Sequence, residues 1–262
     1  MSDNKNSNLP INLQVIPPSV DKAFQNLTDA PTQAIGKTIT DLWRVVFGTI
    51  TYWAEKKELK HDYCLKKLRK ELESSINDIP PSKRIAPSIQ ITAQALENSK
   101  YCLESEELRK MFVNLISKSV NADFAAIVHP SFSEIIRQMS PYDAKILKYY
   151  IEIKPKRLIT YTFSNGIANF NRIAYTFDAY PNPDEAAQIS LSLSSLMRLG
   201  IIAFHDDTTC YPIDDSPFLS SDFYKCCEKE RIAEGLYSES YITGKQCVLT
   251  PYGQVFVQIC VL

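Results

Sequence analysis

The sequence has few of the residues on which common catalytic sites depend. Only three of its 262 residues are histidine and only seven are glycine. It contains no GxSxG, HExxH, Walker A or GxGxxG motif, so the usual signatures of hydrolases, metalloproteases and nucleotide-binding enzymes are missing. The sequence therefore has few of the histidines that a catalytic triad requires and few of the glycines that a phosphate-binding loop requires. We predict that the protein is not an enzyme and that it has no catalytic residues.

The histidines offer little in themselves. His129 precedes Pro130 and Ser131, and a helix that begins there would use Ser131 as its cap rather than as a nucleophile. His205 opens the acidic segment His205–Thr209, which we predict to be a turn between two strands, where such residues usually face solvent. We therefore assign neither histidine a catalytic role.

Metal sites and secretion signals are equally sparse. The seven cysteines are odd in number and form no CxxC pair, and no histidines or cysteines show the spacing of a structural zinc site. We predict no metal and no cofactor, with cysteines that stay reduced and pack as small hydrophobic side chains. The N-terminus is polar and lacks the apolar stretch of a signal peptide, so we expect a cytoplasmic protein.

Neither positive nor negative charge is in excess. The chain has 29 basic and 30 acidic residues, which gives no general attraction to nucleic acid or to an anionic membrane. From Ser140 onward, 11 basic residues face 14 acidic ones, so this part is slightly acidic. The charge balance therefore argues against nucleic acid as a partner.

What the sequence does have is helical periodicity. We predict a flexible arm at residues 1–18 and a helical region at 19–139, in which a proline-free stretch at about 32–78 forms one long amphipathic helix. A bend near Gly48 or in Lys56–Lys60 is equally consistent with the pattern. A helix of this length must dock against others or pair with a second chain, so we also predict a homo-oligomer. Shorter helices should follow at about 89–102, 104–121 and 131–139.

The character of the chain changes at Ser140. We predict a winged-helix-like region at 140–262, with a helical insertion at about 216–239 and a hairpin centred on Thr243–Lys245. It should begin with a helix that Ser140 caps, continue with a β-rich stretch at 158–163 and 173–177, and end with a helix that Thr250 caps. Its signature is the run Leu193–Ile202, which is similar to the second helix and first wing strand of winged-helix domains. The predicted fold class is thus mainly α with a smaller α+β part.

The winged-helix-like signature allows two interpretations. A DNA-binding helix would need basic side chains, and the candidates are Lys156, Arg157 and Arg198. Arg198 is the only basic residue in the helix itself, and the region is acidic, so the charges for phosphate neutralisation are largely missing. We favour a fold used for protein contacts and keep a DNA-binding regulator as an alternative.

The segment Leu42–Ala54 is apolar and rich in aromatic residues. It is too short to span a bilayer, which needs about 20 apolar residues. We interpret it as the core of a bundle or of a dimer, and keep a helix that perturbs a membrane surface as an alternative. Its candidate interaction residues are Trp43, Phe47 and Trp53.

Several segments resemble a bacterial family, the abortive-infection alpha family. The similarity covers most of residues 15–153 and, more loosely, the C-terminal part, and it rests on the segments 16–18, 31–36, 41–43, 47–48, 52–56, 107–115, 129–132, 135–141 and 143–144. The resemblance implies an anti-phage role and brings no catalytic residues with it. Our hypothesis is a non-enzymatic defence factor that recognises a phage or host protein.

Overall fold

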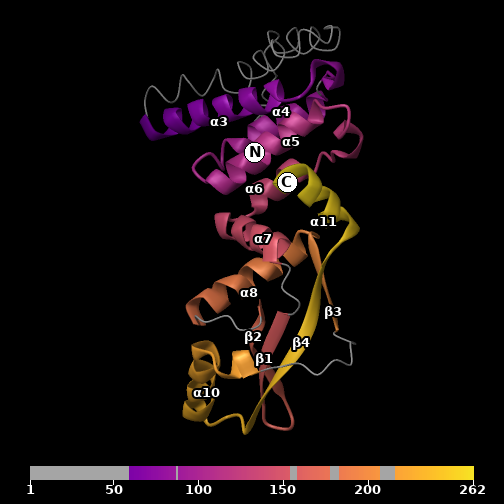
Figure 1. Cartoon of the computed structure of the whole chain (residues 1–262). Helices are drawn as coiled ribbons and strands as arrows, with labels where there is room; N and C mark the ends of the chain where they lie inside the picture. The colour runs from indigo at the N-terminus through magenta and orange to yellow at the C-terminus, as the bar shows by residue number, and fades with distance from the viewer. Residues whose placement is uncertain (1–58, 87, 154–157, 178–182, 207–215) are drawn as a thin grey trace, which may run out of the picture.

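A computed structural model describes residues 59–262, apart from 87, 154–157, 178–182 and 207–215 (Figure 1). The described chain is mainly helical, with a four-stranded antiparallel sheet in its C-terminal half. The predicted arm at 1–18 and the part of the predicted long helix before residue 59 lie outside the described residues. The predicted α-rich class with a smaller β-containing part is confirmed at this level.

Helix α3 (Leu59–Asn77) is the described end of the predicted long helix. Its buried apolar residues follow the expected three-four spacing and are Leu65, Leu68, Leu72 and Ile76. Ile79 is also buried, and Pro80 and Pro81 prevent any continuation, so a single 3-10 turn, η2 (Pro81–Lys83), follows.

The shorter helices are present close to their predicted positions. They are α4 (Ile89–Ser99), α5 (Glu106–Ser119), α6 (Phe132–Gln138) and α7 (Pro141–Ile153), with the 3-10 turn η3 (Ala125–Ile127) between α5 and α6. Helix α5 lies at the centre and packs against α3, α4, α6 and α7. It begins where the Ser105 hydroxyl accepts the N–H of Leu108 at 3.3 Å. Its central position explains why Phe112, Leu115 and Ile116 are completely buried.

The sheet contains β1 (Leu158–Ser164), β2 (Asn169–Phe177), β3 (Ile202–Asp206) and β4 (Glu239–Leu249), in the spatial order β2-β1-β4-β3. Strand β1 occupies an inner position and all seven of its residues are buried. Strands β1 and β2 confirm the predicted β-rich stretch.

The predicted hairpin around Thr243–Lys245 is wrong. Strand β4 runs through these residues without a turn, because Thr243 and Gly244 pair with Thr160 and Ile159 of β1. Further along, β4 pairs with β3, where Val248 faces Ala203. The second of the two strands predicted around the turn His205–Thr209 lies outside the described residues.

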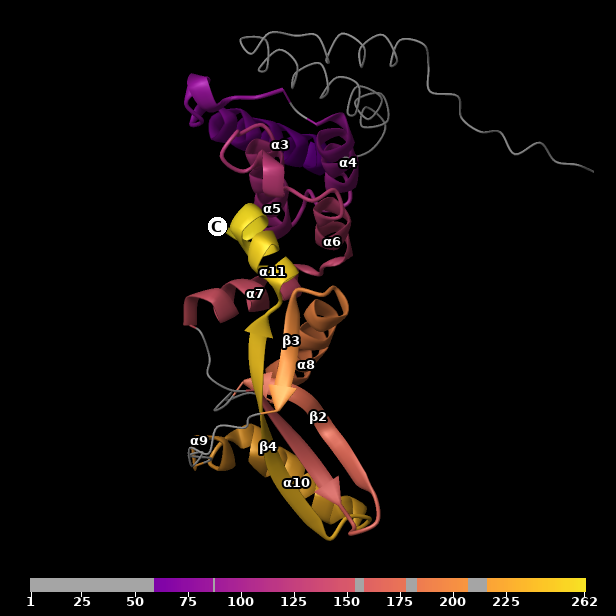
Figure 2. The same cartoon turned by 90° about the vertical axis from the view of Figure 1, so that its right-hand side faces the viewer.

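Three helices accompany the sheet. Helix α8 (Pro183–Arg198) packs against β2 and β3, and α9 (Ser216–Leu219) and α10 (Asp222–Glu234) form a layer near the end of the sheet that lies away from α3–α5 (Figure 2). Helices α9 and α10 occupy the segment that was predicted as a helical insertion. They bury Phe218, Phe223 and Cys227 against Tyr161 of β1 in a second, smaller apolar core.

The C-terminus returns to the helical part of the molecule. Helix α11 (Pro251–Phe256) begins as predicted, with the Thr250 hydroxyl accepting the N–H of Gly253 at 2.8 Å, and continues into a π-helical turn, η4 (Val257–Val261). This turn packs on α5 (Figure 2), where Asn114 donates to the carbonyl oxygen of Cys260 at 3.1 Å. The main apolar core therefore continues across Ser140, and the division into two regions at that residue stays a prediction.

Candidate functional site

The predicted interaction residues fall mainly outside the described part of the chain. Trp43, Phe47 and Trp53 lie outside the described residues, as do Lys156 and Arg157. Arg198 is described, at the C-terminal end of α8. Its guanidinium is exposed and donates from Nη1 to Oε1 of Gln138 at 3.1 Å.

A groove lies beside this arginine, between α8 and the junction of α6 with α7. We call it the α8 groove, and its volume is about 480 Å³. The side chains that line it are mostly neutral and polar: Gln138, Ser140, Tyr142, Asp143, Gln188, Leu191, Ser192 and Ser195. Leu191 stands out because 73% of its surface is exposed.

The one charged residue in the α8 groove is engaged within the protein. Asp143 is buried, and its Oδ2 accepts the backbone N–H of Ser140 at 2.8 Å and the hydroxyl of Ser195 at 3.1 Å. The Ser140 hydroxyl in turn accepts the N–H of Asp143, which completes a reciprocal cap at the start of α7. Asp143 thus joins the start of α7 to α8, and its carboxylate contributes the one negative charge among the lining residues of the groove.

A second cavity of about 230 Å³ lies between α5, α7 and the C-terminal turn. We call it the C-terminal cleft. Its apolar lining comes from Met111, Ala144, Cys260 and Val261, and its charged lining comes from Glu106, Glu107, Lys110 and Lys148. Burial raises the pKa of the Cys260 thiol well above its ordinary value, so this thiol stays protonated.

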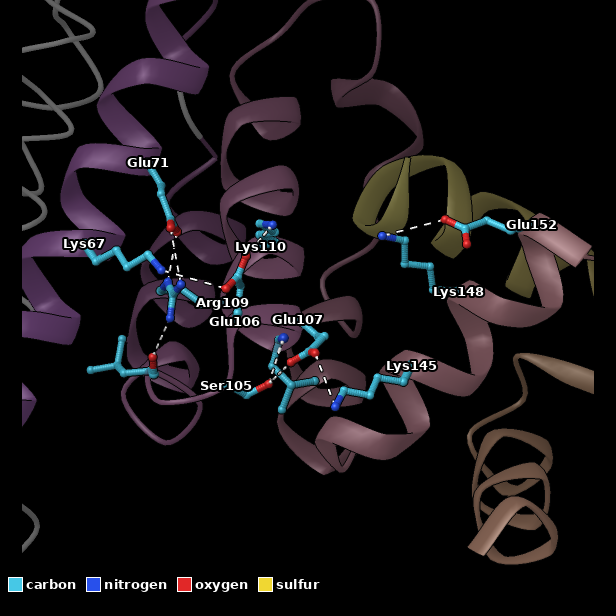
Figure 3. A network of polar contacts seen from close by, with 12 residues as sticks. Lys67, Glu71, Ser105, Glu106, Glu107, Arg109, Lys110, Lys145, Lys148 and Glu152 are labelled. Atoms are coloured by element: carbon cyan, nitrogen blue, oxygen red, sulfur yellow. Dashed lines mark hydrogen bonds and ion pairs between the residues drawn. The ribbon is translucent and has the colours of Figure 1, made fainter. Parts of the chain in front are cut away.

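The charges around the C-terminal cleft pair with one another (Figure 3). Glu106 binds Lys110 at 2.6 Å, and the hydrogen bond from Lys110 lowers the pKa of the Glu106 carboxyl. Glu107 faces Lys145 at 3.7 Å, and Lys148 faces Glu152 at the same distance. These pairs are exposed, and pairs of this kind contribute little to stability. The rim is therefore zwitterionic, without an excess of either charge.

Arg109 belongs to the same network of polar contacts, and it joins two helices. Only 3% of its side chain is exposed, and Nε and Nη2 donate to the two carboxylate oxygens of Glu71 at 2.9 and 3.3 Å (Figure 3). Nη1 donates to the carbonyl oxygen of Leu103 at 2.9 Å. This bidentate pair joins α5 to α3 in a geometry that lysine could not reproduce.

Ser131 occupies the predicted N-cap position of α6, but its side chain does not cap the helix. Its hydroxyl makes no capping hydrogen bond to α6. Instead it lies 2.6 Å from Nδ1 of His129 and hydrogen-bonds to the Tyr252 hydroxyl of α11. The backbone N–H of Ser131 also donates to His129 Nδ1, so that nitrogen acts as an acceptor. The short local loop thus directs Ser131 towards α11, and we interpret the cluster as a link between the two helices.

His205 also differs from its predicted position. It belongs to β3, opposite Gln246 of β4, rather than to a turn. Within the described ranges, no group of three or more histidine, cysteine, aspartate or glutamate side chains is placed to hold a metal ion. Across the same ranges, no helix combines the length and the hydrophobicity needed to cross a membrane.

Comparison with known proteins places the chain in a family. The family described as abortive infection alpha matches residues 60–260. The chain belongs to the abortive infection alpha family. No curated protein and no solved structure matches the chain. The family match covers some of the segments on which the resemblance rests. The segments between 107 and 144 lie inside the matched residues, and those between 16 and 56 precede them.

Within the family match, the polar residues of these segments join separate elements. Arg109 links α5 to α3, and Asn114 links α5 to the C-terminal turn. Ser131 links α6 to α11, and Asp143 links α7 to α8. Sequence reasoning could not identify the α8 groove, whose one local signal was the expected cap at Ser140. Ser195, which donates to the Asp143 carboxylate of that cap, lies on another helix.

Proposed function

We propose that this protein is a phage-defence factor that acts by binding another protein, of phage or host origin, rather than by catalysis. Membership of the abortive infection alpha family supports the defence role. The α8 groove supports the mode of action, and it is the observation on which this part of the proposal rests. We also propose that the protein works in the cytoplasm.

The chemistry of the α8 groove suits contact with a protein. Leu191 offers an exposed apolar anchor, and amide and hydroxyl groups surround it, including those of Gln138, Gln188 and Ser192. Protein interfaces combine a buried core that is more apolar with a polar, solvent-accessible rim. Since Asp143 is already hydrogen-bonded within the protein, a partner would not have to neutralise its buried charge.

Phage plating on cells with and without variant genes tests the proposal. Leu191→Glu places a charge in the groove without removing a buried contact, and we expect it to abolish protection while the protein remains folded. Tyr101→Glu is the matched control, because Tyr101 is 74% exposed and does not line the groove. Protection that survives Leu191→Glu would refute the role of the groove, and equal plating with and without the wild-type gene across a broad phage panel would refute the defence role.

A DNA-binding regulator with a winged-helix-like part is the second candidate. Strand β3 follows α8 directly and pairs with β4, which comes after α9 and α10, and we compare this pair with the wing strands that follow a recognition helix. Against this reading, Arg198 is the only basic residue of α8 and its guanidinium is hydrogen-bonded to Gln138. DNA binding that falls with salt and with charge reversal at Lys156, Arg157 or Arg198 would favour this alternative.

The segment Leu42–Ala54 leads to two further proposals. We propose self-association through Trp43, Phe47 and Trp53, to be measured by light scattering on the wild type and on Trp43→Glu. A discrete oligomer that dissociates in the variant would support it. Flotation with liposomes, lost in the same variant, would instead favour the alternative of an effector that acts on a membrane surface.

A further inference from the structure

The turn between β1 and β2 presents an isoleucine to solvent. Asn165 orders this turn: its side-chain oxygen accepts the N–H groups of Ile167 and Ala168 at 3.0 and 2.8 Å. Gly166 adopts the positive φ of 79° that the turn requires. Ile167 is 97% exposed. A β-branched apolar residue is thus held fully in water by a well-defined turn, where a polar residue would be expected.

The loop between α10 and β4 presents a second apolar residue in the same way. Arg231 orders this loop by donating from Nη1 to the carbonyl oxygens of Tyr237 and Ser238, each at 3.1 Å. Glu228 holds the same guanidinium at 2.8 Å. Leu236, inside the loop, is 68% exposed, and Ile232, one helical turn earlier, is exposed to the same extent.

These two segments adjoin at one end of the molecule. Ser164 at the end of β1 pairs with Glu239 at the start of β4, and the rings of Phe170 and Tyr237 stack with their centroids 6.1 Å apart. Figures 1 and 2 both show the turn and the loop side by side at the end of the sheet farthest from α3–α5. We call this surface the apolar tip; it consists of Ile167, Phe170, Ile232, Leu236 and Tyr237.

The net charge around the apolar tip is negative, because Arg231, which precedes Ile232, is paired with Glu228 and two further acidic residues follow. Segments 164–170 and 232–241 contain two acidic residues, Glu234 and Glu239, and no lysine or arginine. Both carboxylates belong to exposed residues. Glu234 is the last residue of α10, where the carbonyl end of the helix adds partial negative charge. The tip is therefore apolar at its centre and negative at its edge.

We propose that the apolar tip is a docking surface for a protein segment that carries lysine or arginine next to its apolar anchors. Its charge complements such a segment and repels the anionic surface of a membrane. Since Asn165 and Arg231 already hold the two loops in place, little conformational entropy is lost when a partner binds. The surface is distinct from the α8 groove and does not depend on the defence role.

Two labelled peptides test this proposal by fluorescence anisotropy with the full-length protein. One contains leucine and lysine, and the other has glutamate at each lysine position. The variants are Ile167→Ser with Leu236→Ser, and Glu234→Gln with Glu239→Gln. Tyr101→Ser with Glu152→Gln is the matched control, since Tyr101 and Glu152 are exposed and lie on the helical part. All the substituted side chains are exposed, and circular dichroism would check that each variant is folded.

We expect the leucine–lysine peptide to bind, and either tip variant to weaken it about tenfold while the control does not. The leucine–glutamate peptide should bind at least tenfold more weakly to the wild type. Equal binding of both peptides, or unchanged binding by both tip variants, would overturn the proposal. Flotation with vesicles of phosphatidylcholine and phosphatidylglycerol that the apolar tip variant abolishes would overturn it in favour of a membrane.

Discussion

Gly253 of α11 lies so close to Ile201 that a β-carbon at Gly253 would be 1.9 Å from the Ile201 carbonyl oxygen. The same carbonyl accepts the backbone N–H of Thr250 at 3.1 Å, so α11 begins directly on the chain that leaves α8. Gly253→Ala cannot be accommodated without moving backbone. We expect it to lower the free energy of unfolding by about 3 kcal/mol, at the upper end of the usual cost of overpacking.

Gly200→Ala is the control for this substitution. Gly200 has a φ of +74°, but no atom lies within 4 Å of the position that its β-carbon would take. The cost there should be backbone strain alone, about 1 kcal/mol. Chemical denaturation of both variants measures the difference, and equal losses would show that α11 is free to shift away from Ile201.

Arg109 and Glu71 give a second prediction, on the junction between α5 and α3. Arg109→Met removes three hydrogen bonds from a side chain that is 3% exposed, and leaves Glu71 partly buried without its partner. We expect a loss of about 3 kcal/mol in the free energy of unfolding. Arg69→Met breaks the exposed pair with Glu73 on the same helix and should cost about 0.5 kcal/mol. Urea denaturation followed by circular dichroism measures both, and similar losses would contradict the prediction.

The helices could be predicted from the sequence because their signals are local. The apolar spacing of α3, the prolines that end it and the Thr250–Pro251 start of α11 all act within one or two turns. Strand β4 could not be predicted in the same way. Thr243–Lys245 has the composition of a turn, and what keeps it extended is pairing with β1, far earlier in the chain.

The candidate site was less predictable than the fold for the same reason. The α8 groove lies where α7 and α8 meet, and the hydrogen bond that Asp143 accepts there from Ser195 on the other helix has no local sequence pattern. At Ser131 the sequence has the local pattern of a capping side chain, but the hydroxyl instead contacts Tyr252 near the C-terminus. Polar residues that join distant elements are recognisable only once the elements are in place.

The pH dependence of stability should report on Glu228. Its carboxylate accepts hydrogen bonds from Arg231, Tyr161 and Ser240, and chiefly the Arg231 bond lowers its pKa to about 2. The folded state thus favours the charged form. The stability that this carboxylate contributes is fully present above its ordinary pKa of 4.5 and is lost as the pH falls towards 2.

We therefore expect the wild type to exceed Glu228→Gln in free energy of unfolding most strongly above pH 4.5, with a difference that shrinks on acidification. Denaturation series at several pH values measure it. Since Arg231 is the main cause of the lowered pKa, the difference should depend much less on pH when both proteins also carry Arg231→Met. A difference that is constant with pH in the wild-type background would contradict the assignment.

Alkylation should separate the cysteines by burial. Cys226 is half-buried on α10, whereas its neighbour Cys227, and also Cys247 and Cys260, are buried. Burial raises the pKa of Cys247 to about 12 and raises that of Cys260, and the thiolate is the reactive form.

Among the cysteines that the structure describes, we expect iodoacetamide to modify Cys226 first, as read by mass spectrometry. Cys247 and Cys260 should stay protected up to pH 9 and react only after denaturant is added. Cys226→Ser should remove the fast phase, and labelling of Cys260 at the same rate in the native protein would show that the C-terminal turn separates readily from α5.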